Sequence, residues 1–176
     1  MQNFISIQYY HSPVGELLLG AYENQLCICD WRYRKMRPTV DKRIQAAVNA
    51  VYVEQEDQVI SQCITQLEEY FRKERRTFDI PLLMLGSDFQ KHVWNELILI
   101  PFGETQSYMG LAQKLNNVGA IRAVASANGA NALSILVPCH RIIGSDGDLT
   151  GYAGGLSAKK RLLELEGSLS QQMTLF

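Results

Sequence analysis

Apolar and polar positions alternate in short runs over the first part of the chain. Residues 3–33 hold three apolar runs, separated by polar turns near Pro13 and Gly15 and near Glu23 and Gln25. Short apolar runs bounded by such turn residues are typical of antiparallel strands. The pattern therefore predicts a small antiparallel meander over residues 3–33.

Two helical periods follow the meander. Residues 39–52 carry a weak one and are predicted as a helix. Residues 54–76 carry a stronger one, because their apolar side chains recur at helical spacing, at Val59, Ile60, Cys63, Leu67, Tyr70 and Phe71. Residues 77–86 return to an extended or strand-like pattern.

A second set of elements begins near residue 86. Asp88 is expected to cap a helix over 89–100, and two short helices, 104–115 and 120–129, are joined by a tight turn. Such a pair is a helix-turn-helix candidate. The apolar run 133–137 is expected to be a buried strand, and 157–167 a final helix. We predict an α/β (α+β) protein with domains 1–85 and 86–169 and a flexible tail, 170–176.

Composition is that of an ordinary globular protein. The chain has 176 residues, of which 47% are hydrophobic and 20% charged, enough for one or two small domains. Four sparsely spaced cysteines do not resemble a secreted disulfide framework, and neither a signal peptide nor an apolar run of membrane-spanning length is apparent. We expect a reduced, cytoplasmic protein.

Charge is unevenly distributed, although the net charge is only -1. No Asp or Glu occurs between Glu104 and Asp146, whereas Lys114, Arg122 and Arg141 lie in that stretch. Such a stretch can lie against phosphates without repulsion. An Ala-rich apolar segment that simply holds few charges explains the pattern equally well.

Cys139 and His140 are adjacent, directly after the predicted strand 133–137. A thiol reacts as its thiolate, so a nearby base would activate it. Neighbours in an extended segment point to opposite faces, and a water would then be needed to connect them. Glu166, placed where a helix end disfavours an anion, could orient the histidine. Alternatively, all three are structural: a buried thiol, a core histidine and a solvated helix end.

The segment Val137 to Ile143, "VPCHRII", is similar to the active-site signature of the O6-alkylguanine-DNA alkyltransferases. Segments 89–115, 120–131 and 151–167 resemble the rest of that family's C-terminal domain, in order. The resemblance is close over about residues 58–167 and loose before them. It implies a small N-terminal ribonuclease-H-like sheet-and-helix domain, followed by a mainly helical domain with a helix-turn-helix.

The same resemblance implies a role for each matching residue of the active site. Cys139 would take the alkyl group irreversibly from guanine O6, and less well from O4-alkylthymine. His140 would draw the thiol proton through a water, and Glu166 would hold the histidine. Asn131 would tie together the turns around the site, and Tyr108 would donate a hydrogen bond to the leaving guanine.

The resemblance further implies double-stranded DNA containing O6-alkylguanine as the partner of a monomer that needs no cofactor. The expected DNA contacts are Arg122, which would fill the space of the flipped base, with Ala123, Ala127 and Tyr108. The expected substrate pocket is formed by Val137, Pro138, Ile142, Tyr152, Ala153 and Lys159. Cys27 and Cys29 lack an obvious third and fourth ligand, since His11 and Asp30 have no support, so we expect no metal.

Three other functions are weighed against repair. A non-catalytic lesion-binding relative would lack the nucleophile, whereas Cys139 is present. A thiol hydrolase would turn over many times, and a DNA-binding module would not need the thiol. Separately, the last five residues, "QMTLF", look like the bacterial sliding-clamp-binding pentapeptide, with Gln172, Leu175 and Phe176 as its contacts.

Overall fold

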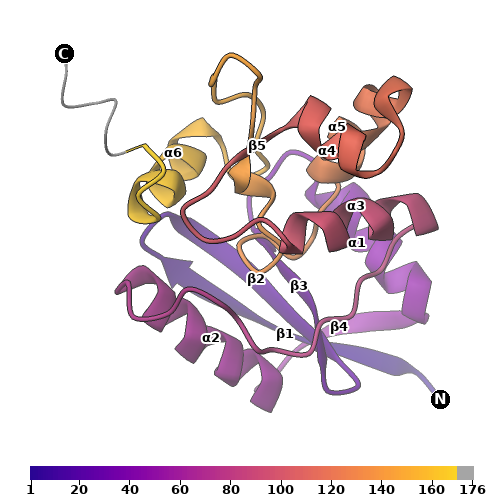
Figure 1. Cartoon of the computed structure of the whole chain (residues 1–176). Coiled ribbons are helices and arrows are strands. Elements are labelled where there is room, and N and C mark those ends of the chain that lie inside the picture. The colour runs from indigo at the N-terminus through magenta and orange to yellow at the C-terminus, as the bar shows by residue number, and fades with distance from the viewer. Residues whose placement is uncertain (170–176) are drawn as a thin grey trace. The chain divides into compact units, whose positions relative to one another are not determined.

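The computed structural model describes residues 1–169, and the chain divides into two compact units, Met1–Ser87 and Asp88–Phe176 (Figure 1). The clamp-binding prediction for Gln172, Leu175 and Phe176 lies outside the described residues. Within the described part, none of the helices has the length and apolar character that crossing a bilayer requires.

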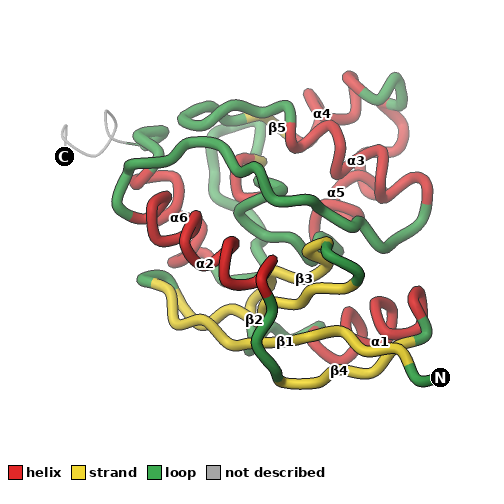
Figure 2. The backbone as a smooth tube through the Cα atoms, turned by 90° about the horizontal axis from the view of Figure 1, so that it is seen from below, coloured by secondary structure: helices red, strands yellow, loops and turns green. Residues whose placement is uncertain are grey.

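A four-stranded sheet forms the first unit (Figure 2). The strands are β1 (Asn3–Ser12), β2 (Gly15–Tyr22), β3 (Gln25–Trp31) and β4 (Ala50–Glu54), in the order β3-β2-β1-β4. β1, β2 and β3 are antiparallel neighbours, which confirms the predicted meander, whereas β4 runs parallel to β1.

The helix predicted over residues 39–52 is wrong in its second part. Helix α1 (Arg37–Val48) ends at Asn49, which adopts a left-handed conformation with φ 47°. Residues 50–54 then pair with β1 as β4. The β-branched and aromatic side chains of Val51, Tyr52 and Val53 favour a strand, and pairing with β1 overrides the weak helical period.

Helices lie on both faces of this sheet. Cys29 and Asp30 are consecutive in β3, so their side chains point to opposite faces. Cys29 contacts Cys63 of α2 (Gln58–Phe71), while Asp30 accepts a hydrogen bond from Arg37 at the start of α1 (2.9 Å). The buried Asp30 thereby anchors the connection between β3 and α1.

The second unit is mainly helical. Its helices are α3 (Asp88–Ile98), α4 (Tyr108–Lys114), α5 (Ile121–Gly129) and α6 (Leu156–Leu165). The short 3₁₀ turn η1 (Val118–Ala120) joins α4 to α5, and the indole of Trp94 in α3 donates to the Ala127 carbonyl of α5 (2.8 Å). A sheet-and-helix unit followed by a mainly helical unit confirms the predicted fold class.

The strand predicted over 133–137 is wrong. The segment is a buried turn, held by the Leu133 carbonyl, which accepts from the Val137 amide (2.8 Å), and Ile135 has φ 74°. Side-chain hydrogen bonds from Asn131 offer this backbone an alternative to a strand ladder. After the turn come the 3₁₀ helix η2 (Cys139–Arg141) and β6 (Ile142–Ile143), which pairs with β5 (Gln106–Ser107).

Candidate active site

Cys139 begins the 3₁₀ helix η2 and is 3% exposed. A 3₁₀ helix has about three residues per turn, so the side chains of consecutive residues diverge. Cys139 and His140 are therefore neighbours on a tight turn rather than on an extended strand. The turn replaces the extended geometry expected from the sequence, and it buries both side chains in the second unit.

His140 is held by Glu166, which follows the last residue of α6. The His140 Nε2 and Glu166 Oε1 atoms are 2.7 Å apart, and both side chains are fully buried. Burial raises the pKa of Glu166, but the hydrogen bonds from His140 and Arg141 outweigh burial and lower it to about 2. The carboxylate is therefore ionised and can only accept, so Nε2 of His140 carries the donated proton.

The other ring nitrogen of His140 is available as a base. Burial lowers the pKa of His140, which keeps the ring neutral, although Glu166 acts in the opposite direction. With the proton on Nε2, the Nδ1 atom has a free lone pair, and it makes no hydrogen bond to any residue between 1 and 169. A buried neutral imidazole with an unused lone pair can accept a proton.

Asn131 connects the turn 133–137 to the start of η2. Its Nδ2 donates to the Val137 carbonyl, and its Oδ1 accepts from the Leu133 amide, both at 2.9 Å. The Val137 carbonyl also accepts from the Cys139 amide at 2.8 Å. The Asn131 side chain is 2% exposed, so these bonds are shielded from water and fix the backbone that carries Cys139.

Lys159 of α6 holds the loop that follows β6. Its buried ammonium donates to the carbonyls of Thr150 (2.9 Å) and Gly151 (3.3 Å). Burial lowers the pKa of Lys159 to about 8, against the opposing effect of Cys139. The hydroxyl of Tyr108 donates to the same Thr150 carbonyl over a longer distance, 3.4 Å, and burial raises the pKa of Tyr108, which keeps its proton in place.

The remaining residues predicted for the pocket differ in their exposure to solvent. Val137, Pro138 and Ile142 are buried, whereas Tyr152 and Ala153 are partly exposed. The rings of His140 and Tyr152 meet edge-on, with centroids 6.5 Å apart. Three of the predicted pocket residues are thus buried, and two are partly accessible to solvent.

Helix α5 presents two different faces. Arg122 and Ala123 are exposed, and Lys114 at the end of α4 is exposed as well. Ala127, in contrast, is 3% exposed, and the DNA contact expected through this residue stays a prediction. Ala127 lies on the packed face of α5, where its carbonyl accepts from the Trp94 indole of α3.

Arg141 belongs to the same buried group as His140 and Glu166. It was expected instead on a surface that faces phosphates. It is 6% exposed, its Nε and Nη2 donate to the two Glu166 oxygens at 2.9 Å, and its Nη1 donates to the Ile100 carbonyl at 2.6 Å. A buried Arg almost always has a carboxylate partner. That rule predicts a carboxylate partner for a buried Arg141, but only the tertiary structure identifies the partner as Glu166.

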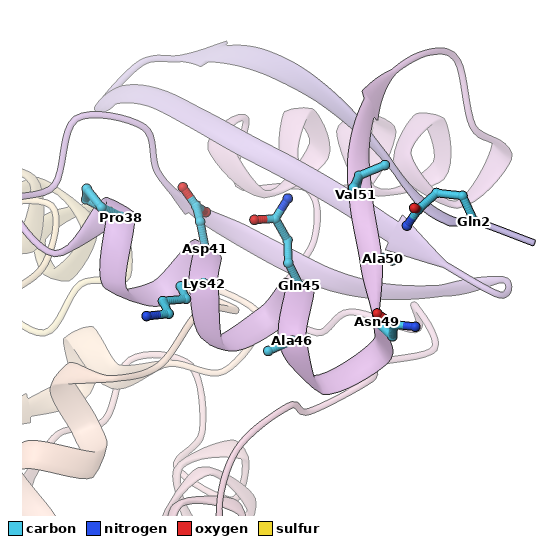
Figure 3. Close-up of a pocket in the computed structure, with 9 residues that line it drawn as sticks. All are labelled: Gln2, Pro38, Asp41, Lys42, Gln45, Ala46, Asn49, Ala50 and Val51. Atoms are coloured by element: carbon cyan, nitrogen blue, oxygen red, sulfur yellow. The ribbon is translucent and has the colours of Figure 1, made fainter.

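A separate hollow lies in the first unit, along α1 and the start of β4 (Figure 3). Asp41, Lys42 and Gln45 line it from the helix, and Asn49 and Val51 line it from the other side. None of its nine lining residues is a Cys or a His, and the Asp41 carboxylate already accepts from Tyr52 at 2.7 Å. This hollow therefore offers neither a thiol nor an imidazole.

The geometry around Cys139 defines a class of protein. A buried thiol beside a neutral histidine, which a carboxylate orients, belongs to proteins in which the cysteine acts as a nucleophile. The exposed, acid-free surface around α5 adds a face that suits an anionic partner.

Comparison with known proteins identifies the family. The ribonuclease-like domain of 6-O-methylguanine DNA methyltransferase matches residues 5–84, and the DNA binding domain of the same proteins matches residues 88–168. The chain therefore belongs to the 6-O-methylguanine DNA methyltransferase family, and the resemblance found in the sequence is confirmed.

Similar proteins extend over almost the whole chain. Two are named methylated-DNA–protein-cysteine methyltransferase. The one from Methanosarcina acetivorans is 43% identical and covers 90% of this chain and 96% of its own. The one from Mycolicibacterium paratuberculosis is 47% identical and covers 94% of each. The crystal structure of Mycobacterium tuberculosis OGT in complex with DNA superposes with a TM-score of 0.78, at 37% identity over 93% of each chain.

Proposed function

We propose that this chain repairs DNA by accepting the alkyl group of O6-alkylguanine on Cys139, once per molecule. The observation that carries the proposal is the buried arrangement of Cys139, His140 and Glu166 in a chain of this family. In the reaction, Cys139 Sγ forms a bond to the alkyl carbon, and the bond from that carbon to guanine O6 breaks. The thioether that results has no leaving group that water displaces easily, so the protein does not turn over.

His140 is proposed to take the thiol proton at Nδ1. Its Nε2–H is committed to Glu166, so Nδ1 is the ring atom with a lone pair to offer. The side chains of Cys139 and His140 diverge on η2, and a water between Sγ and Nδ1 would relay the proton. The electron pair of the former S–H bond is then free to attack carbon.

Tyr108 is proposed to assist the leaving guanine. When the carbon–oxygen bond breaks, its electron pair moves to the guanine, which a hydrogen-bond donor stabilises. The Tyr108 hydroxyl is protonated; it makes a long contact to the Thr150 carbonyl, 3.4 Å, and also interacts with the Asn128 side chain. That contact can be exchanged for one to the base. Lys159 would keep the 150–151 loop in place meanwhile.

The DNA side of the proposal rests on α5. The alkylated oxygen is inside the base stack, so the base must be flipped out before Cys139 can reach it. Arg122 is exposed at the start of α5 and would fill the space that the base leaves. The small side chain of Ala123 beside it would let the helix approach a narrow groove. O4-alkylthymine is a weaker substrate in this proposal.

Intact-protein mass spectrometry tests the reaction. The protein is mixed with duplex DNA containing O6-methylguanine, and its mass should rise by one CH₂ group, because a methyl replaces the thiol hydrogen. Peptide mapping should find the methyl on Cys139, and Cys139→Ala should bind DNA without gaining mass. Methylation of Cys63 instead, or many turnovers per molecule, would contradict the proposal.

The C-terminal pentapeptide supports a second proposal, that the chain also binds a sliding clamp. Gln172 would hydrogen-bond at the rim of an apolar pocket on the clamp, and Leu175 and Phe176 would fill that pocket. Short segments that order on binding reach only moderate affinity, because ordering costs free energy. Such a tether would bring a single-use repair protein to newly copied DNA.

A further inference from the structure

Arg141 has no role in the proposed reaction, yet it makes several contacts beside His140 and Glu166. Its guanidinium donates to both oxygens of Glu166, at 2.9 Å each, and the Oε1 atom that it contacts also faces His140 Nε2. Its third nitrogen donates to the Ile100 carbonyl, and the guanidinium carbon lies 5.9 Å from the centre of the Phe102 ring. The planar fork thereby sets the plane of the carboxylate.

Charge gives this geometry a chemical consequence. A buried carboxylate beside a histidine, with no other partner, favours the protonated imidazolium. Three charged side chains act on His140: Glu166 favours the protonated ring, whereas Arg141 and Lys159 disfavour it. Arg141 is the one that contacts the carboxylate directly, so it shares the negative charge that would otherwise act on His140 alone.

We propose that Arg141 is a positioning residue, which orients the Glu166 carboxylate and shares its charge so that His140 remains a neutral base toward Cys139. The inference rests on the proposed function for the identity of the reaction. The protonation state of His140, however, is a property of the free protein and can be measured without DNA.

Nitrogen NMR of the imidazole rings tests the protonation state directly. The chain has only three histidines, so His140 can be assigned by comparison with His140→Gln. Between about pH 8 and about pH 5.5, wild-type His140 should keep the neutral Nε2–H form. In Arg141→Met the ring should gain its second proton within that range, because the pKa of His140 is raised when the cation is removed.

The rate of Cys139 alkylation by free O6-benzylguanine, which avoids DNA binding, gives a second readout. Arg141→Met should move the acidic limb of the rate profile to higher pH, with a loss of about tenfold for each unit of that shift. Arg141→Lys keeps the charge but not the planar fork, so its rate should fall at every pH while the limb stays in place. Arg161→Met, an exposed change on α6, is the matched control and should alter neither property.

A purely structural role predicts something different. Arg141→Met would then lower the melting temperature and the rate equally at all pH values, with His140 still neutral in the NMR titration, and this result would overturn the proposal. If Arg141→Met does not fold, Arg141→Lys provides the test. A shift of the acidic limb of the rate profile in that variant would contradict the proposed role of Arg141. If Cys139 of the wild-type protein is not alkylated by the substrate, the proposed function is refuted instead. The NMR titration would still test the role of Arg141 by itself, because it needs no substrate.

Discussion

Glu166 shows how one buried carboxylate organises the site at the scale of single residues. It accepts from the His140 ring and twice from the Arg141 guanidinium, and it comes directly after the last residue of α6. A helix C-terminus disfavours a negative charge by up to about 1 kcal/mol. The cation and the histidine compensate for that disadvantage and for the loss of hydration.

The pH dependence of stability should report this cluster. Burial raises the pKa of Glu166, but its partners lower it from 4.5 to about 2 in the folded protein. A depressed carboxyl pKa stabilises the fold above the unfolded pKa, and that stabilisation is lost as the pH falls from about 4.5 to about 2. Urea unfolding should therefore show Glu166→Gln to be less stable at pH 7 by about 3 kcal/mol, with the difference shrinking over this interval.

Glu164→Gln is the matched control for this experiment. Glu164 is also on α6 but is exposed, with a long contact to Lys160 at 3.9 Å, so its substitution should change stability little at any pH. A difference between wild type and Glu166→Gln that stays constant from pH 7 to pH 2 would argue against the ionised, hydrogen-bonded carboxylate.

Helix α5 carries the proposed DNA contact at the scale of elements. One side, with Val124, Ala127 and Asn128, is buried against the rest of its unit, and the other side carries Arg122 and Ala123. The helix has no acidic residue to repel phosphates. Since the packed face fixes the orientation of α5, Arg122 lies on the exposed side of this helix.

Arg122→Ala should separate base flipping from chemistry. The variant should be slower on O6-methylguanine in duplex DNA by about tenfold or more, because flipping a base costs a few kcal/mol that the Arg side chain offsets. Reaction with free O6-benzylguanine, which needs no flipping, should remain close to wild type. Single-turnover alkylation rates measure both.

Lys114→Ala provides the control, because Lys114 is an exposed cation on the neighbouring helix α4. It should weaken DNA binding in a salt-dependent way without a selective effect on the duplex reaction. Equal slowing of both substrates by Arg122→Ala would speak against insertion into the base stack.

At the scale of the whole molecule, two family domains occupy nearly all of the described chain, residues 5–84 and 88–168. The tail 170–176 lies beyond both matches. The proposed clamp contact therefore adds a partner through residues that the family match does not include, and it can be tested independently of repair.

Calorimetric titration of the full chain into a bacterial sliding clamp tests the tail. We expect micromolar binding, about -8 kcal/mol on the standard scale. The double variant Leu175→Ala/Phe176→Ala should lose it, because these side chains supply the apolar contact. Gln171→Ala, just outside the pentapeptide, should bind as wild type does. No binding at high micromolar clamp would exclude the contact.

The sequence by itself determined the elements with strong periods and the residues of the proposed catalytic motif. The meander over 3–33 and the helix containing Val59 to Phe71 follow from local alternation and helical spacing, which neighbours along the chain impose. Cys139, His140 and Glu166 were found from the chemistry of their side chains and from the family resemblance. These patterns are local, so they can be recognised in the sequence without knowledge of the fold.

Only the tertiary structure decided the conformations and partners that depend on distant residues. Residues 50–54 became a strand because β1 offered a partner, and 133–137 became a turn because Asn131 satisfied its backbone. Arg141 lies 25 residues from Glu166 along the chain, and no local pattern encodes their contact. Burial of Ala127 likewise follows from how α5 packs. Long-range pairing and burial set these features, because they depend on which surfaces meet in the folded chain.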